Sequence, residues 1–322
     1  MRSNPYVFVV GCPRSGTTLL QRMLDHHPSL AVANDTHFIP KALDNDRAGG
    51  DPPLSAELVE EVASYRRFYR LGIGADAVET AAAGATTYSG FVARLYDELA
   101  ALRGKPLAGE KTPDYVRHLP LLHLLFPWAR MVHIVRDGRD VALSTLEWAR
   151  PDKGPGRFEL WSSEPVAVCA LWWEWLVRTG RRDGASLGSG RYLEVGYERL
   201  VADPEPEIRR IASFLELEFA PEMLTSFERK TRVEPGLSAK SAWLPPTPGL
   251  RDWRAHMAAR DVELFEALAG TTLRELGYPT TYDTISRDTA ELAEHCRAWW
   301  RAEMVRRDHR NASDATQAES AR

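Results

Sequence analysis

Short apolar runs alternate along the chain with segments in which apolar residues recur at helical spacing. The apolar runs at 6–10, 130–135 and 191–195 have the length of buried strands. Periodic segments that predict helices occupy 17–26, 57–70, 88–103, 138–148, 165–182, 205–216 and 260–276. Strands that alternate with helices predict an α/β fold, a parallel β-sheet flanked by helices, with ligands at the carboxyl ends of the strands.

Two segments rich in Gly, Pro and Asp interrupt this pattern. They lie at 41–56 and 151–157, and both predict loops. Because long loops beside a site often gate it, we expect the lids of a binding site in 41–56 and 149–165.

The pattern ends with a helix and a polar tail. A helix is predicted at about 288–304. Its apolar stripe is expected to pack against its own domain, and a homodimer through the same stripe is the alternative. The stripe consists of Leu292, Cys296, Trp299 and Trp300. Residues 306–322 show no apolar pattern and predict a disordered tail. We expect a single domain over 1–305, with its core in 5–278.

Composition narrows the class of protein. The chain has 322 residues, of which 44% are hydrophobic and 27% charged, as in a globular domain. A net charge of −4 argues against a nucleic-acid partner. No apolar run approaches the ~18–20 residues of a transmembrane segment, and "YVFVV" near the start is short for a signal sequence. We therefore expect a cytoplasmic protein.

The three cysteines give no sign of a metal site or a disulfide. Cys12, Cys169 and Cys296 are far apart, and none has the spacing of a zinc ligand pair. Cys12 lies within a glycine-bearing turn, where a small residue is tolerated and where no histidine adjacent in sequence would activate it.

That turn is the strongest chemical signal in the sequence. "GCPRSGTT", residues 11–18, joins the first predicted strand to the first helix with the glycine spacing of a phosphate-binding loop. Backbone N–H groups there point at an anion, Arg14 adds a permanent cation, and Ser15, Thr17 and Thr18 add hydroxyls. Thr17 stands where nucleoside triphosphatases carry Lys, so the loop suits a group less charged than a triphosphate.

Two stretches identify a family. "GCPRSGTTLLQRMLDHHP" resembles the 5′-phosphosulfate loop of sulfotransferases that use 3′-phosphoadenosine-5′-phosphosulfate (PAPS), and "VHIVRDGRDVALS" resembles their 3′-phosphate motif. The resemblance implies a P-loop-NTPase-like sulfotransferase fold. It places Arg136 and Ser144 on the 3′-phosphate of the donor. The 5′ side would be bound by Pro13, Arg14, Ser15, Gly16, Thr17 and Thr18.

Within the family, the match favours the branch of tyrosylprotein and related sulfotransferases. "DTHFIP" resembles a stretch of that branch whose Glu is the proposed general base, and Asp35 takes its position. "GEKTP" places Lys111, arriving from another strand end, where the branch carries a Lys that stabilises the transferring group. Cytosolic relatives carry a His as base after their Lys-Thr pair, but Pro113 stands here. His37 is the alternative base, since its ordinary pKa suits proton transfer near neutrality.

Weaker parts of the resemblance concern the nucleotide. "VGYERL" implies that Tyr197 helps hold it. "GLRDWR" resembles a C-terminal segment that folds over it, with Arg251 as a phosphate ligand and Trp253 nearby. Ser241 or Ser238 would supply another hydroxyl.

The expected reaction is metal-independent in-line sulfuryl transfer to a hydroxyl. Asp35 takes the acceptor proton, Lys111 and Arg14 stabilise the leaving 5′-phosphate, and adenosine 3′,5′-bisphosphate (PAP) is released. The expected acceptor is a sugar, lipid-linked or secondary-metabolite small molecule. Two alternatives stay open, a metal-dependent small-molecule kinase and a non-catalytic nucleotide-binding protein with the same fold.

Overall fold

The computed structural model describes residues 3–43, 50–225, 246–247, 249 and 251–320, with side chains up to 307 in the last helix. The chain forms two compact units. Unit 1 comprises Met1–Val135 and Thr179–Pro248, and unit 2 comprises Arg136–Arg178 and Gly249–Arg322. The expectation of a single domain over 1–305 stays a prediction.

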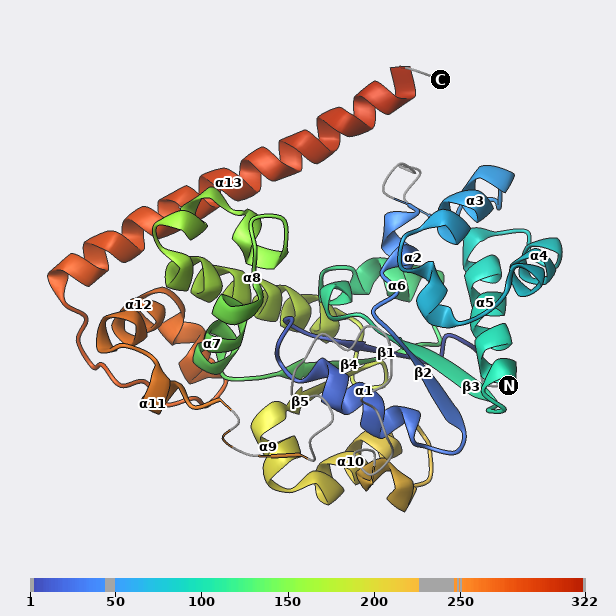
Figure 1. The fold of residues 1–322 in the computed structure, drawn as a ribbon, viewed down its shortest axis with the longest axis horizontal. Helices are drawn as coiled ribbons and strands as arrows, with labels where there is room; N and C mark the ends of the chain where they lie inside the picture. The colour runs from blue at the N-terminus through green and yellow to red at the C-terminus, as the bar shows by residue number, and fades with distance from the viewer. Residues whose placement is uncertain (1–2, 44–49, 226–245, 248, 250, 321–322) are drawn as a thin grey trace. The chain divides into compact units, whose positions relative to one another are not determined.

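Unit 1 is built on an all-parallel five-stranded sheet in the order β2-β3-β1-β4-β5, so the chain has the predicted α/β fold (Figure 1). The strands are β1 (Val7–Val10), β2 (Leu30–Asn34), β3 (Leu107–Lys111), β4 (Arg130–Val135) and β5 (Tyr192–Gly196). β1, β4 and β5 confirm the three predicted strands. The hydrophobic pattern did not predict the residue ranges of β2 and β3.

A glycine and two buried polar residues explain why the hydrophobic pattern did not predict β3. β1 reads "VFVV" and is buried along its whole length, as in the centre of a parallel sheet. β3 reads "LAGEK" and is equally buried, although it ends in Glu110 and Lys111. Gly109 is required there because a Cβ would come within 2.5 Å of the Val7 carbonyl oxygen on β1. A glycine that allows close approach of β1 and two buried polar residues take the place of an apolar run in β3.

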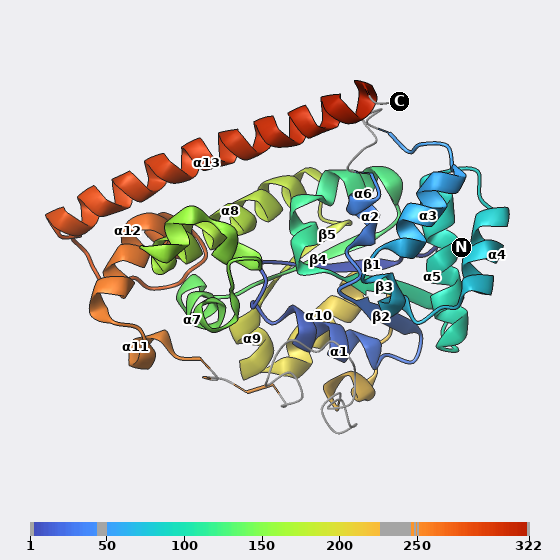
Figure 2. The ribbon, with the colours of Figure 1, turned by 45° about the horizontal axis from the view of Figure 1, so that its top comes forward.

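Helices cover this sheet. α1 (Thr17–Asp25), α9 (Tyr197–Ala202) and α10 (Pro204–Phe214) lie on one side, and α6 (Leu119–Leu125) lies on the other (Figures 1 and 2). The remaining helices of the unit are α2 (Phe38–Lys41), α3 (Ala56–Ser64), α4 (Ala75–Ala83), α5 (Tyr88–Leu102) and the 3-10 helices η1 (Phe68–Leu71), η2 (Pro113–Arg117) and η5 (Pro221–Leu224).

The apolar core of unit 1 lies between β1 and its covering helices. Leu20 and Met23 of α1 pack in one cluster with Val7 of β1 and with Ile208 and Ile211 of α10. α1 and α10 are therefore amphipathic covers of the sheet, and the predicted helices at 17–26, 88–103 and 205–216 are confirmed.

One predicted helix is shorter than expected. The helix predicted over 57–70 ends at Ser64, and the chain continues into η1. Tyr65 has an extended ψ of 126°, so the backbone leaves the helix before the three arginines that follow.

Unit 2 contains α7 (Gly138–Trp148), α11 (Trp253–His256), α12 (Ala259–Glu275) and α13 (Arg287–Ser320). α8 (Pro165–Ser186) begins in this unit and ends in unit 1. The predicted helices at 138–148, 165–182 and 260–276 are confirmed.

The C-terminal helix corrects one expectation. α13 was predicted to end near residue 304, with a disordered tail after it, but the helix continues to Ser320. The sequence from 287 to 320 contains neither Gly nor Pro and is rich in Ala, Arg and Glu. Beyond residue 304 these helix-forming residues continue the helix without an apolar stripe.

The predicted loops are partly structured. Residues 44–49 of the first loop lie outside the described residues. The second loop contains two short 3-10 helices, η3 (Gly154–Arg157) and η4 (Glu159–Ser162). A lid role for either loop stays a prediction. No helix among the described residues combines the length and the apolar character needed to span a membrane.

A buried histidine in the sheet predicts how stability depends on pH. His133 of β4 is fully buried, its Nδ1 lies 2.7 Å from the Tyr192 hydroxyl, and burial, with the Arg181 charge, lowers its pKa to about 3. The unfolded chain binds this proton below about pH 6.5 and the folded chain does not. Stability is therefore complete above pH 6.5 and falls as the pH drops towards 3, by about 1.4 kcal/mol per pH unit for this group.

Urea unfolding of His133→Gln at several pH values tests this contribution. The slope of unfolding free energy against pH should decrease by about one proton relative to the wild type. The matched control is His295→Gln on an exposed face of α13, which should keep the wild-type slope. Equal slopes in both variants would contradict the assignment.

Candidate active site

The loop between β1 and α1 has the geometry of an anion-binding turn. Gly16 caps α1 in a left-handed conformation with φ 92°, so no capping side chain competes with an anion for the first amides of the helix. A Cβ at this position would come within 2.3 Å of the Tyr197 ring. The Ser15 side chain is fully buried, and its Oγ has no hydrogen-bond partner among the described residues.

This turn places several predicted donor-binding residues together. Arg14 also has a positive φ, 77°, and the Ser15 amide donates to the Cys12 carbonyl over 3.1 Å. The Tyr197 ring lies against the loop at Gly16, and its role in holding the nucleotide stays a prediction.

Lys111 stands beside the loop at the end of β3. Its Nζ donates to the Asp35 carboxylate over 2.9 Å and to the Thr18 hydroxyl over 3.4 Å. The residue is only 1% exposed. Parallel pairing of β2 with β3 sets Asn34 opposite Lys111, and the Asp35 amide donates to the Lys111 carbonyl over 2.7 Å. The sheet register therefore brings the predicted cation, the predicted base and the loop hydroxyl into contact.

The two candidate bases have different electrostatic surroundings. Burial acts to raise the pKa of Asp35, but the charge and hydrogen bond of Lys111 outweigh it and hold that pKa below its ordinary value. Burial and the Arg67 charge lower the pKa of His37 to about 4. At neutral pH Asp35 is therefore ionised and His37 is neutral, and both are able to accept a proton.

Arg70 is a member of this group that the sequence did not single out. Its Nη1 lies 3.6 Å from an Asp35 oxygen and donates to the Asn34 carbonyl over 3.3 Å. Asp35 therefore lies between two cations, Arg70 and Lys111. Arg70 occupies η1, within a stretch predicted to be a plain helix, so neither spacing nor motif gave a signal for it.

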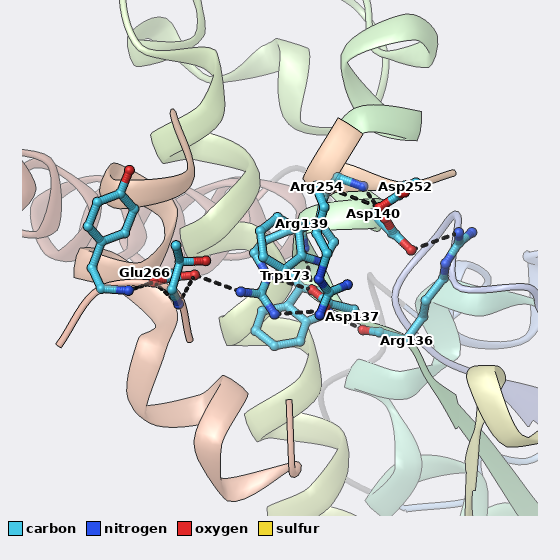
Figure 3. A network of polar contacts seen from close by, with 11 residues as sticks. Arg136, Asp137, Arg139, Asp140, Trp173, Asp252, Arg254 and Glu266 are labelled. Carbon is cyan, nitrogen blue, oxygen red and sulfur yellow. Dashed lines mark hydrogen bonds and ion pairs between the residues drawn. The ribbon is translucent and has the colours of Figure 1, made fainter. Parts of the chain in front are cut away.

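Unit 2 holds the predicted 3′-phosphate ligands on or beside α7. Arg136 lies two residues before the helix and pairs with Asp140 over 3.3 Å (Figure 3). Asp140 also accepts from the Trp253 amide over 3.0 Å. The Arg136 carbonyl accepts from the Trp173 indole N–H over 3.1 Å. Burial raises the pKa of Asp140, although the Arg136 charge opposes that rise.

A buried charge network anchors the start of α7. The Arg139 guanidinium is fully buried, donates to both Asp137 oxygens over 3.0 and 2.8 Å, and donates to Glu266 of α12 over 2.6 Å (Figure 3). The Trp253 ring covers it at 3.7 Å. Gly138 is needed beside it because a Cβ would come within 2.5 Å of the Trp173 ring.

The other predicted nucleotide ligands differ in their surroundings. Ser144 is buried on α7. Arg251 is bound by both carboxylate oxygens of Glu147, each over 2.6 Å. Ser238 and Ser241 lie outside the described residues. Among the described residues, no group of three or more His, Cys, Asp or Glu side chains is arranged to hold a metal ion.

Comparison with known proteins gives consistent matches. Residues 5–221 match the sequence model of the sulfotransferase family. The protein-tyrosine sulfotransferase A of Caenorhabditis elegans is 28% identical over 225 residues, which are 69% of this chain and 53% of the relative. Protein-tyrosine sulfotransferase 2 of Gallus gallus is 28% identical over 275 residues, 79% of this chain and 67% of the relative. The chain thus spans about half the length of the worm relative.

A solved structure supports the fold. The sulfotransferase domain from the Synechococcus PCC 7002 olefin synthase superposes with a TM-score of 0.57 at 24% identity, covering 91% of this chain and 94% of that domain. At this identity the likeness concerns the fold, and it agrees with the predicted P-loop-like parallel sheet.

The buried network of unit 2 yields a stability prediction. Arg139→Met would leave the Asp137 and Glu266 carboxylates buried without their cation, so unfolding free energy from urea denaturation should fall by about 3–5 kcal/mol. The control is Arg287→Met on α13, an 88% exposed residue paired with Glu291, which should leave stability unchanged. Similar effects of the two substitutions would contradict the structural role of the network.

Proposed function

Because this chain belongs to the sulfotransferase family, we propose that it transfers a sulfuryl group from PAPS to an acceptor hydroxyl. The observation that supports this most is the position of Lys111. Its ammonium group contacts both a hydroxyl of the anion-binding loop and the carboxylate of Asp35. A cation in this position can stabilise the charge that develops on the leaving group while the neighbouring base takes the acceptor proton.

The loop residues fit the 5′-phosphosulfate group. Pro13, Arg14, Ser15, Gly16, Thr17 and Thr18 would hold it, and the donor supplies an activated sulfuryl group. The glycine cap, the buried Ser15 hydroxyl and the Lys111 ammonium group form a donor set suited to oxyanions. Tyr197 would pack on this loop and on the nucleotide.

The reaction follows from these positions. The acceptor oxygen forms a bond to sulfur while the bond from sulfur to the bridging oxygen of the donor breaks in line. Asp35 takes the acceptor proton, and Lys111 and Arg14 stabilise the negative charge on the leaving 5′-phosphate. The products are a sulfate ester and PAP. The low pKa of Asp35 suits a transition state in which the bond to the leaving group is largely broken, by analogy with phosphoryl transfer.

Arg136 and Ser144 would bind the 3′-phosphate, with Arg251 as a further ligand. Arg136 is held by Asp140, and Arg251 is held by Glu147, so both guanidinium groups are oriented by carboxylates. A bidentate arginine contact to phosphate is among the strong charge-assisted hydrogen bonds.

The acceptor is proposed as a hydroxyl compound. The sequence favoured a sugar, lipid-linked or secondary-metabolite acceptor in the cytoplasm, and the names of the relatives add protein tyrosine as a candidate. Neither the family match nor the relatives favour the kinase alternative or a non-catalytic protein.

Two substitutions test the separate roles proposed for Lys111 in the chemical step and for Arg136 in binding the donor. Lys111→Met should lower kcat by about 10²–10³-fold, because it removes a cation from the leaving group. Arg136→Ala should raise the KM for PAPS by about ten- to hundredfold with a smaller effect on kcat. The assay measures PAP release with the best acceptor from a panel of a tyrosine peptide, p-nitrophenol and a sugar glycoside.

The control for both is Arg209→Ala, which removes an exposed arginine of α10 paired with Glu205 and should leave both constants unchanged. A Lys111→Met enzyme with wild-type kcat would rule out the proposed role of Lys111. Full activity of Asp35→Asn would transfer the role of base to His37.

A further inference from the structure

The segment that carries both candidate bases has an unusual backbone. Asp35 and His37 have φ angles of 58° and 62°, in the left-handed region, on either side of the fully buried Thr36. Each such residue costs about 1–3 kcal/mol and persists only where the surroundings hold it firmly. Something nearby must therefore hold Thr36.

Glu110 of β3 meets that requirement. Its carboxylate is fully buried and accepts a hydrogen bond from the Thr36 amide over 3.0 Å. The Tyr96 hydroxyl donates to the other oxygen over 2.8 Å, and the Thr112 hydroxyl donates to the first. The donors come from the segment after β2, from α5 and from the residue after β3.

A carboxylate at position 110 is unusual because it is fully buried and the hydrogen-bond donors around it are neutral. No ion pair involving Glu110 is found among the described residues, so its charge is stabilised by three neutral donors. Burying an acid without a cation is costly, and burial raises the pKa of Glu110 despite those hydrogen bonds. A carboxylate offers acceptor sites only, which matches three converging donors. The next residue on the strand is Lys111. The end of β3 therefore contacts the Asp35 side chain through Lys111 and the following residue, Thr36, through Glu110.

We infer that Glu110 is a positioning residue, whose buried carboxylate holds the Thr36 amide and thereby fixes Asp35 between Lys111 and Arg70. The inference rests on the proposed function, because it assigns Glu110 to the same sulfuryl-transfer site. It adds a residue that contacts neither donor nor acceptor in the proposed reaction.

A double-mutant cycle separates positioning from general support of the fold. Glu110→Leu removes every acceptor at similar volume and should lower kcat by about ten- to hundredfold, with the KM for PAPS changed less than about twofold. In an Asp35→Asn background, Glu110→Leu should lower kcat by less than about threefold, because the carboxylate that Glu110 positions is already absent. Equal losses in both backgrounds, or a parallel rise in KM, would overturn the inference.

Conservative variants keep the test independent of misfolding. Glu110→Gln retains an acceptor for Thr36 and should recover most of the activity. Tyr96→Phe and Thr112→Val each remove a donor but leave the Thr36 contact, so each should stay within about threefold of the wild type. A loss in either of them as large as in Glu110→Leu would show that Thr36 is not the relevant partner.

A measurement without turnover distinguishes failure of this inference from failure of the proposed function. In Glu110→Asp the shorter side chain withdraws from Thr36, so the Thr36 amide should exchange with deuterium at least about tenfold faster while the amides of β1 and β4 keep their protection. Unchanged Thr36 exchange would overturn the inference even in an active enzyme. Faster exchange in a protein without sulfuryl transfer would support the holding role and refute only the proposed reaction.

Discussion

The ion pair between the buried Lys111 and the partly buried Asp35 is the interaction on which the candidate site depends. The two residues stand at the ends of neighbouring parallel strands, and the backbone bond from the Asp35 amide to the Lys111 carbonyl fixes their separation. Lys111 would be costly to bury without this carboxylate. The same pair keeps Asp35 ionised and sets Lys111 against the hydroxyl of Thr18. Strand register, electrostatics and the anion loop are thus linked through one ammonium group.

Much of the fold could be predicted from the sequence because buried parallel strands and amphipathic helices leave clear patterns. β1 is a uniform apolar run, β4 is apolar except for Arg130 and His133, and α1 carries its apolar face at helical spacing. β3 left no such pattern, because Gly109 allows close contact with β1 while the strand buries a carboxylate and an ammonium group. The length of α13 was also missed, since beyond residue 304 the helix rests on backbone propensity and has no apolar stripe.

The candidate site could be predicted where a motif is contiguous. Arg14, Gly16 and Lys111 came from short stretches, and the structure places Lys111 beside the loop. Arg70 and Glu110 could not be found in that way, because each acts on Asp35 or Thr36 through contacts between segments distant in the chain. The buried Arg139 network also required the fold, since Glu266 lies on a distant helix.

Nucleotide binding tests the central claim, a donor site built for PAPS, without knowledge of the acceptor. Isothermal titration calorimetry would compare PAP, adenosine 5′-phosphate and ATP with Mg²⁺, using the wild type and Arg136→Ala. We expect PAP to bind the wild type at least about tenfold more tightly than either other nucleotide, and Arg136→Ala to lose most of this preference. Binding of ATP with Mg²⁺ as tight as that of PAP, or no gain from the 3′-phosphate, would contradict a donor site for PAPS.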